Sequence, residues 1–209
     1  MRKIARNISR IFHPTFSPLL AFFLTLIATD ISSNYSPYQL LVIGAIITVL
    51  TIILPLSVVL FLKWVGLVTQ IELNDKSERI APLMISVIFI WGCSELLYRY
   101  NFPITLILFY RLASILIVIA TFITLFWKIS MHALGWGILS AIALILFGFR
   151  ETPYFFIFPL VILISGVVSS ARLFLNAHTQ TQIYSGFTLG LFGMLIGLFF
   201  QSMIINHIL

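Results

Sequence analysis

The chain has 209 residues, of which 61% are hydrophobic and 9% are charged, and its formal net charge is +6. Soluble domains carry about a quarter charged residues and at most about half apolar ones, so this composition excludes a soluble globular domain, a disordered chain and a disulfide-stapled module. It indicates an integral membrane protein whose length, residues 1–209, is that of a single domain.

Long apolar stretches follow one another along the chain and are separated by short polar turns. Because each stretch is continuously apolar rather than alternating, it predicts a transmembrane helix and not a strand of a membrane barrel. Residues 1–14 precede them as a basic interfacial segment. The expected fold is therefore an all-α, polytopic bundle of about six to seven transmembrane helices, from the stretches 16–28, 40–62, 83–97, 104–127, 133–149, 154–168 and 187–205.

Most basic residues lie in the loops on one side of the predicted membrane. If all seven stretches cross, Arg99 and Arg150 fall on one side, and the other side carries Arg2, Lys3, Arg6, Arg10, Lys63, Lys76, Arg79, Lys128 and Arg172. The positive-inside rule predicts that the more basic side is cytoplasmic. The expected location is a bacterial inner membrane. Since these cations sit at the ends of apolar stretches, we expect them to contact membrane lipids and not nucleic acid.

Two charged residues, Glu95 and Arg111, lie well inside predicted helices, on either side of the turn at 101–103. Charges within a bilayer are costly and are usually paired. The two helices are expected to be antiparallel neighbours, so the sequence predicts an ion pair between them.

Three polar clusters, 72–82, 128–132 and 169–182, lie at helix ends on the more basic side, each separated from the next by two crossings. They contain His132 and His178, whereas His13 and His207 lie in terminal segments and are assigned no role. Two imidazoles beside cationic donors suit phosphoryl transfer, in which one ring attacks phosphorus and the other protonates the leaving oxygen. The expected anion-binding donors are Lys76, Arg79, Lys128 and Arg172. No cysteine or carboxylate pair accompanies the histidines, so neither a metal nor another cofactor is expected.

Spacing inside the third cluster predicts its local geometry. His178 and Gln182 are four residues apart, so on a helix they share a face, and the amide can accept a hydrogen bond from one ring nitrogen. Arg172 precedes His178 by six residues, which point apart on a straight helix. Both reach one site only if the backbone bends between them, and we expect a helix end near Asn176.

These residues resemble the three motifs of the type-2 phosphatidic acid phosphatase (PAP2) superfamily. Arg172, five residues and His178 are similar to its third motif, SR-x5-H-x3-D. Ser130-Met131-His132 resembles the second, PSGH, and the segment 76–82 resembles a degenerate form of the first, K-x6-RP. The motifs occur in the family's order. The resemblance implies a PAP2-like helical core and a phosphatase that needs no metal.

The family's roles carry over to the matching positions. By resemblance, His178 is the nucleophile that forms a phosphohistidine, and His132 protonates the leaving group. Arg172 and Ser130 bind phosphate, as do Lys76 and Arg79 by a looser match. The implied substrates are lipid phosphates and diphosphates: phosphatidic acid, phosphatidylglycerophosphate, polyprenyl diphosphates or lipid A. The family usually works on the outer, periplasmic face, whereas the distribution of charge here favours the cytoplasmic one.

The chain departs from the family at several motif positions. Gln182 stands where the third motif has aspartate, and a neutral amide orients an imidazole without stabilising its charged form. The alternative function is therefore a catalytically impaired protein that binds or moves lipid anions. A third reading, a prenyltransferase, comes from Asn74, Asp75 and Glu78. Such enzymes hold Mg²⁺ with two acidic clusters, and the sequence has one.

The last predicted helix carries two pairs of glycines spaced by four residues, Gly186 with Gly190 and Gly193 with Gly197. Small residues at this spacing let transmembrane helices approach closely. We expect these glycines to pack the last helix against another helix of the same chain. The alternative is that they form a homodimer interface.

Overall fold

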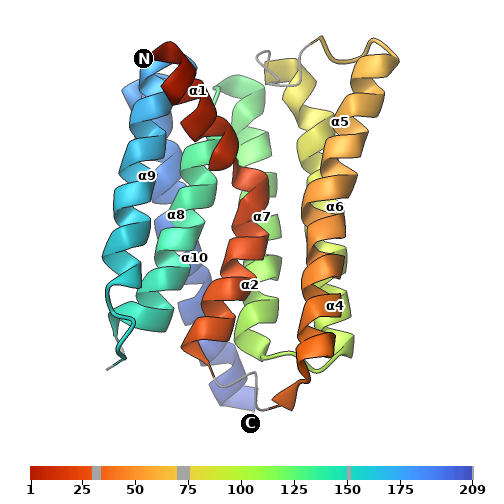
Figure 1. Cartoon of the computed structure of the whole chain (residues 1–209), viewed down its shortest axis with the longest axis vertical. Helices are drawn as coiled ribbons and strands as arrows, with labels where there is room; N and C mark the ends of the chain where they lie inside the picture. The colour runs from red at the N-terminus through yellow and green to blue at the C-terminus, as the bar shows by residue number, and fades with distance from the viewer. Residues whose placement is uncertain (30–33, 70–75, 150–151, 209) are drawn as a thin grey trace. The chain divides into compact units, whose positions relative to one another are not determined.

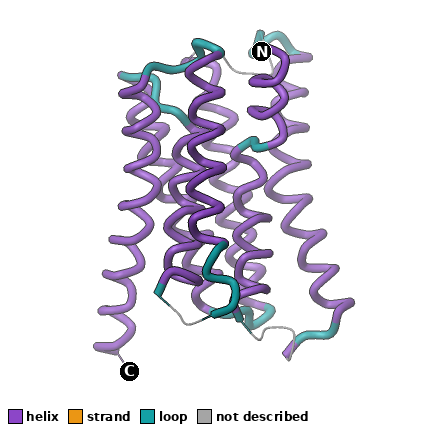
Figure 2. Tube along the Cα trace, turned by 60° about the vertical axis from the view of Figure 1, so that its left-hand side comes forward, coloured by secondary structure: helices purple, strands orange, loops and turns teal. Residues whose placement is uncertain are grey.

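A computed structural model describes residues 1–29, 34–69, 76–149 and 152–208. Asn74 and Asp75, two residues of the acidic segment, lie outside the described residues, as does Arg150. The described part consists of helices joined by short loops, with no strand in it (Figures 1 and 2). The all-α prediction is confirmed.

Among the described residues, seven helices are long and apolar enough to cross a membrane, so the protein is a multi-pass membrane protein, as the sequence predicts. The first candidate span, Arg2–Ala28, extends the short stretch 16–28 back through the basic segment. The others agree with the predicted stretches, with some of their ends shifted: Pro37–Trp64, Glu78–Arg99, Ile104–Phe126, Met131–Gly148, Ile157–Phe174 and Gln180–Gln201.

The chain divides into two compact units. Unit 1 comprises residues 1–14 and 130–209, and unit 2 comprises residues 15–129. The helices of unit 1 are α1 (Arg2–Ile11), α8 (Met131–Ala143), α9 (Ile157–Phe174) and α10 (Gln180–Ile208), and a π-helical turn, Leu144–Gly148, follows α8. That the two units form a single domain stays a prediction.

Unit 2 contains α2 (Ser17–Ala28), α4 (Pro37–Thr48), α5 (Leu54–Trp64), α6 (Lys76–Arg99) and α7 (Ile104–Phe126). A 3₁₀ turn, Pro14–Phe16, precedes α2 along the chain. Local sequence explains several of these boundaries. Ser36 caps α4 in a capping box with Gln39, and Pro103 directly precedes α7.

A π-helical turn, Val49–Ile53, joins α4 to α5. Its cause is Pro55, which has no N–H and whose ring would clash with the carbonyl of Thr51 in a regular helix. The widened turn relieves this clash, and Leu54 N–H donates to the carbonyl of Val49, five residues back.

The predicted ion pair inside the membrane is confirmed. Arg111 Nη2 of α7 lies 2.7 Å from Glu95 Oε1 of α6. The Arg111 guanidinium carbon also lies 5.8 Å from the ring centres of both Trp91 and Tyr98, within the range of a cation–π interaction. The pair therefore compensates both charges and links the two helices.

We expect Glu95→Gln and Arg111→Gln each to lower the free energy of unfolding. The double variant should lose less than the sum of the two single losses. Each single change leaves one charge unpaired within a transmembrane helix, and the double change removes both. A coupling free energy of about 1 kcal/mol is expected. Unfolding by denaturant in detergent measures all four proteins, and additive single effects would contradict the prediction.

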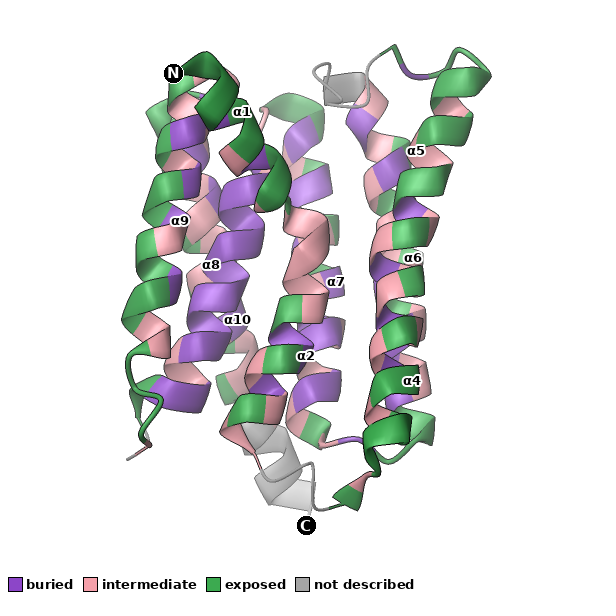
Figure 3. Ribbon diagram, viewed as in Figure 1, coloured by how far each residue is buried: buried purple, intermediate pink, exposed green. Residues whose placement is uncertain are grey.

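In unit 1, every residue of α8 after Met131 is buried, as the colour of the helix in Figure 3 shows. It packs against α10 through glycines: a Cβ on Gly186 would lie 2.6 Å from the Ser130 carbonyl oxygen, and one on Gly137 would lie 2.3 Å from that of Phe187. The first glycine pair of α10 therefore lets α10 pack closely on α8 within unit 1, as expected from the spacing. A homodimer stays a prediction. The close contact fixes the start of α8 against the start of α10, where the site residues lie.

Candidate functional site

The candidate site is the part of unit 1 where α9, α10 and the start of α8 meet α1. It contains five of the residues predicted from the sequence: His132, Arg172, His178, Gln182 and Ser130. The other three, Lys76, Arg79 and Lys128, belong to unit 2.

Within unit 2, Lys76 begins α6, and its side chain is not among those described. Arg79 lies one turn later and is buried. Lys128 follows the end of α7 and is half-buried. That these three cations bind the same anion as unit 1 stays a prediction.

The predicted helix end near Asn176 is confirmed. Helix α9 ends at Phe174, and Asn176 has a φ of 53°, the left-handed conformation that asparagine adopts more readily than most residues. The N–H of Ala177 donates to the Arg172 carbonyl at 3.1 Å and closes the turn. The reversal changes the direction of the chain between Arg172 and His178, as the six-residue spacing requires.

His178 and Gln182 make the predicted contact: His178 Nδ1 lies 3.1 Å from Gln182 Oε1. The backbone N–H of Thr179 donates to the same oxygen at 3.2 Å, which identifies that atom as the acceptor oxygen of the amide. An oxygen that accepts requires the His178 proton to be on Nδ1, so the lone pair of the neutral ring is on Nε2. The ring is 8% exposed, so water competes little for this arrangement.

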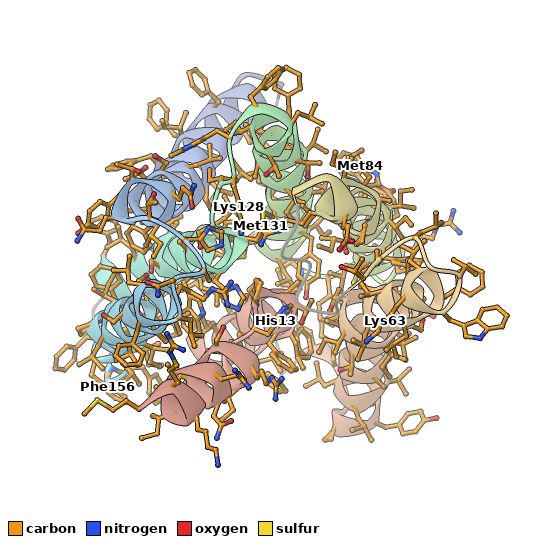
Figure 4. All side chains as sticks on the ribbon, turned by 90° about the horizontal axis from the view of Figure 1, so that it is seen from above. His13, Lys63, Met84, Lys128, Met131 and Phe156 are labelled. Atoms are coloured by element: carbon orange, nitrogen blue, oxygen red, sulfur yellow. The ribbon has the colours of Figure 1, made fainter. Side chains whose placement is uncertain are left out.

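His132 lies in the first turn of α8 and is also 8% exposed. Its Nε2 is 3.0 Å from the carbonyl oxygen of Ser9 and 3.3 Å from the Ser9 hydroxyl. Because a carbonyl can only accept, Nε2 carries a proton. The His13 ring meets the His132 ring edge-on, with the centroids 5.0 Å apart. Figure 4 labels His13 and Met131, which mark the two segments that meet here.

Arg172 occupies the last turn of α9, and its Nη1 donates to the Ser9 hydroxyl at 2.8 Å. Its Nε is buried and has no hydrogen-bond partner within the described part of the chain. His132 lies within electrostatic range of three further groups, the guanidinium of Arg172 and the imidazoles of His13 and His178. The site is therefore rich in donors and positive in character.

Ser130, which the sequence assigns to phosphate binding, is fully buried as the N-cap of α8. Its hydroxyl accepts from the N–H of Ala133 at 3.4 Å, and its own N–H donates to the Gln182 carbonyl at 3.2 Å. In this structure Ser130 ties α8 to α10. A contact with phosphate stays a prediction.

Sequence reasoning missed the contribution of α1. It treated residues 1–14 as an interfacial segment and gave His13 no role, whereas Ser9 and His13 both contact His132. A signal was present: Ala5 and Ser9 are small, lie four residues apart, and form one face of an otherwise basic helix. Both are buried, whereas Arg2, Lys3, Arg6 and Arg10 are exposed.

The arrangement combines an imidazole whose lone pair is on Nε2, a second imidazole with a proton on Nε2, and a guanidinium with an unused buried N–H. These groups can bind an oxyanion, supply a nitrogen nucleophile and transfer a proton. Comparison of the chain with family models, curated proteins and solved structures found no match.

Proposed function

We propose that the protein is a membrane-embedded phosphatase that hydrolyses a lipid phosphate or diphosphate. The observation that carries this is the His178–Gln182 pair, in which Thr179 identifies the accepting oxygen and thereby the nitrogen with the lone pair. A second imidazole and a guanidinium lie in the same unit. The motif order resembles the PAP2 superfamily, whose members use these residue types for this chemistry.

In the proposed reaction, His178 Nε2 attacks phosphorus and forms a P–N bond while the P–O bond to the lipid breaks. His132, as the imidazolium with a proton on each ring nitrogen, gives its Nδ1 proton to the leaving oxygen and becomes neutral. Water then attacks the phosphohistidine, His132 takes up a proton from that water, and inorganic phosphate leaves. Arg172 stabilises the charge on the phosphoryl oxygens in both steps.

The proposal also concerns three cations of unit 2 and the side of the membrane on which the site lies. For Lys76 and Arg79 the first-motif resemblance, and for Lys128 its charge, are the only support for a role in phosphate binding. We place the protein in a bacterial inner membrane. The basic residues of α1 favour a cytoplasmic site because they belong to no motif, whereas the family resemblance favours a periplasmic one.

The direct test is phosphate release by the purified protein in nanodiscs from a panel of lipid phosphates and diphosphates, with chelator present. We expect release from at least one lipid at a rate that the chelator leaves unchanged, because the proposed reaction uses only side chains and water. A rate that requires added Mg²⁺ would contradict the mechanism.

The second candidate is a protein that binds or moves lipid anions without turnover. The specific observation in its favour is Gln182, whose neutral amide orients His178 but cannot stabilise its charged form as a carboxylate does. Binding of a lipid phosphate without release would favour this candidate. The substitution Gln182→Asp would then test whether a carboxylate alone restores turnover.

A further inference from the structure

We propose that Ser9 of α1 is a positioning residue of this site, which orients both the His132 ring and the Arg172 guanidinium. The proposal rests on the phosphatase function above and adds a residue outside the three motifs. Ser9 lies 123 positions before His132 and 163 before Arg172, yet contacts both. It is 5% exposed, so these contacts face little competition from water.

The two polar groups of Ser9 have separate partners. The carbonyl oxygen accepts from His132 Nε2 at 3.0 Å, and the hydroxyl oxygen accepts from Arg172 Nη1 at 2.8 Å. The hydroxyl also lies 3.3 Å from His132 Nε2. Ser9 thus holds one donor from α8 and one from α9 at a fixed separation.

This arrangement has a consequence for each partner. The His132 proton on Nε2 is directed at the Ser9 carbonyl and stays there, so the leaving oxygen takes the second proton, which the imidazolium form carries on Nδ1. The Arg172 guanidinium is held through Nη1, which leaves its buried Nε–H, without a partner in the described part of the chain, for a phosphoryl oxygen. A planar guanidinium fixed at one corner presents its other donors in a defined direction.

Other contacts hold α1 in place independently of the Ser9 hydroxyl. Trp136 Nε1 donates to the Phe12 carbonyl at 3.2 Å, and the Phe12 and Trp136 rings meet edge-on with centroids 5.6 Å apart. Ala5 is buried one turn before Ser9. The substitution Ser9→Ala therefore removes the hydroxyl while these contacts and the carbonyl remain.

We expect Ser9→Ala to lower kcat/KM about tenfold to a hundredfold, the effect of losing one hydrogen bond to a charged group, while the protein stays folded. Ser9→Thr keeps the hydroxyl and should restore most of the activity. The control is Asn7→Ala, an exposed position on the same helix, which should behave as the parent.

A double-mutant cycle separates positioning from a general structural effect. If Ser9 acts through Arg172, then Ser9→Ala should cost little in the Arg172→Lys background, because the guanidinium that it orients is gone. Equal losses in both backgrounds, or no rescue by threonine, would overturn the proposal.

The same assays distinguish this proposal from the function on which it rests. Phosphate release by the parent, none by His178→Ala and parental activity in Ser9→Ala would overturn the role of Ser9 and leave the phosphatase standing. No release by the parent from any lipid would overturn both.

Discussion

Replacing His178 with alanine should reduce phosphate release by at least about 10³-fold, because the substitution removes the proposed nucleophile and leaves only binding groups. The protein should remain folded, since the glycine contacts between α8 and α10 do not involve the His178 ring. The readout is release from the best lipid of the panel, together with trapping of a covalent phosphoenzyme. His207→Ala, near the end of α10, is the matched control.

His132→Ala offers a contrasting result within the same experiment. A general acid matters less as the leaving group becomes more acidic. We therefore expect His132→Ala to release little phosphate from lipid substrates but to regain part of the parental rate with an aryl phosphate. His178→Ala should release little phosphate from either substrate. A phosphoenzyme in His178→Ala, or equal rescue of both variants, would contradict the assigned roles.

The substitution Gly190→Ala should lower the free energy of unfolding by about 3 kcal/mol, at the upper end of the cost of overpacking. The new Cβ would lie 2.3 Å from the Leu134 carbonyl oxygen and 2.9 Å from the Ile138 nitrogen, and both are backbone atoms of α8. Side-chain rotation cannot relieve these contacts, so α8 and α10 must separate. Chemical unfolding in detergent measures the loss.

The control for this prediction is Gly166→Ala in α9, where a Cβ would have no neighbour within 4 Å. The higher helix propensity of alanine predicts stabilisation by about 0.5–1 kcal/mol there. Equal stability of the two variants would show that close packing of α8 on α10 does not hold the unit together. Since Ser130 and Gln182 lie at this junction, Gly190→Ala should also lower phosphate release.

Sequence alone predicted the features that depend on local geometry. The transmembrane helices follow from continuous apolar stretches, and the ion pair of Glu95 with Arg111 follows from the cost of unpaired charge in a bilayer. The contact of His178 with Gln182 follows from four-residue spacing, and the helix end near Asn176 follows from the six residues between Arg172 and His178. In these last two cases the helical repeat relates positions that are near in the chain.

The contribution of α1 was decided only by the tertiary structure. Ser9 and His13 meet His132, more than a hundred positions further along the chain, and nothing in the basic pattern of residues 1–14 specifies that partner. The contact exists because small Ala5 and Ser9 let α1 lie against α9, while Phe12 packs on Trp136 of α8. Helical periodicity determines which face of a segment is buried, but shape and hydrogen-bond complementarity between distant segments determine what that face meets.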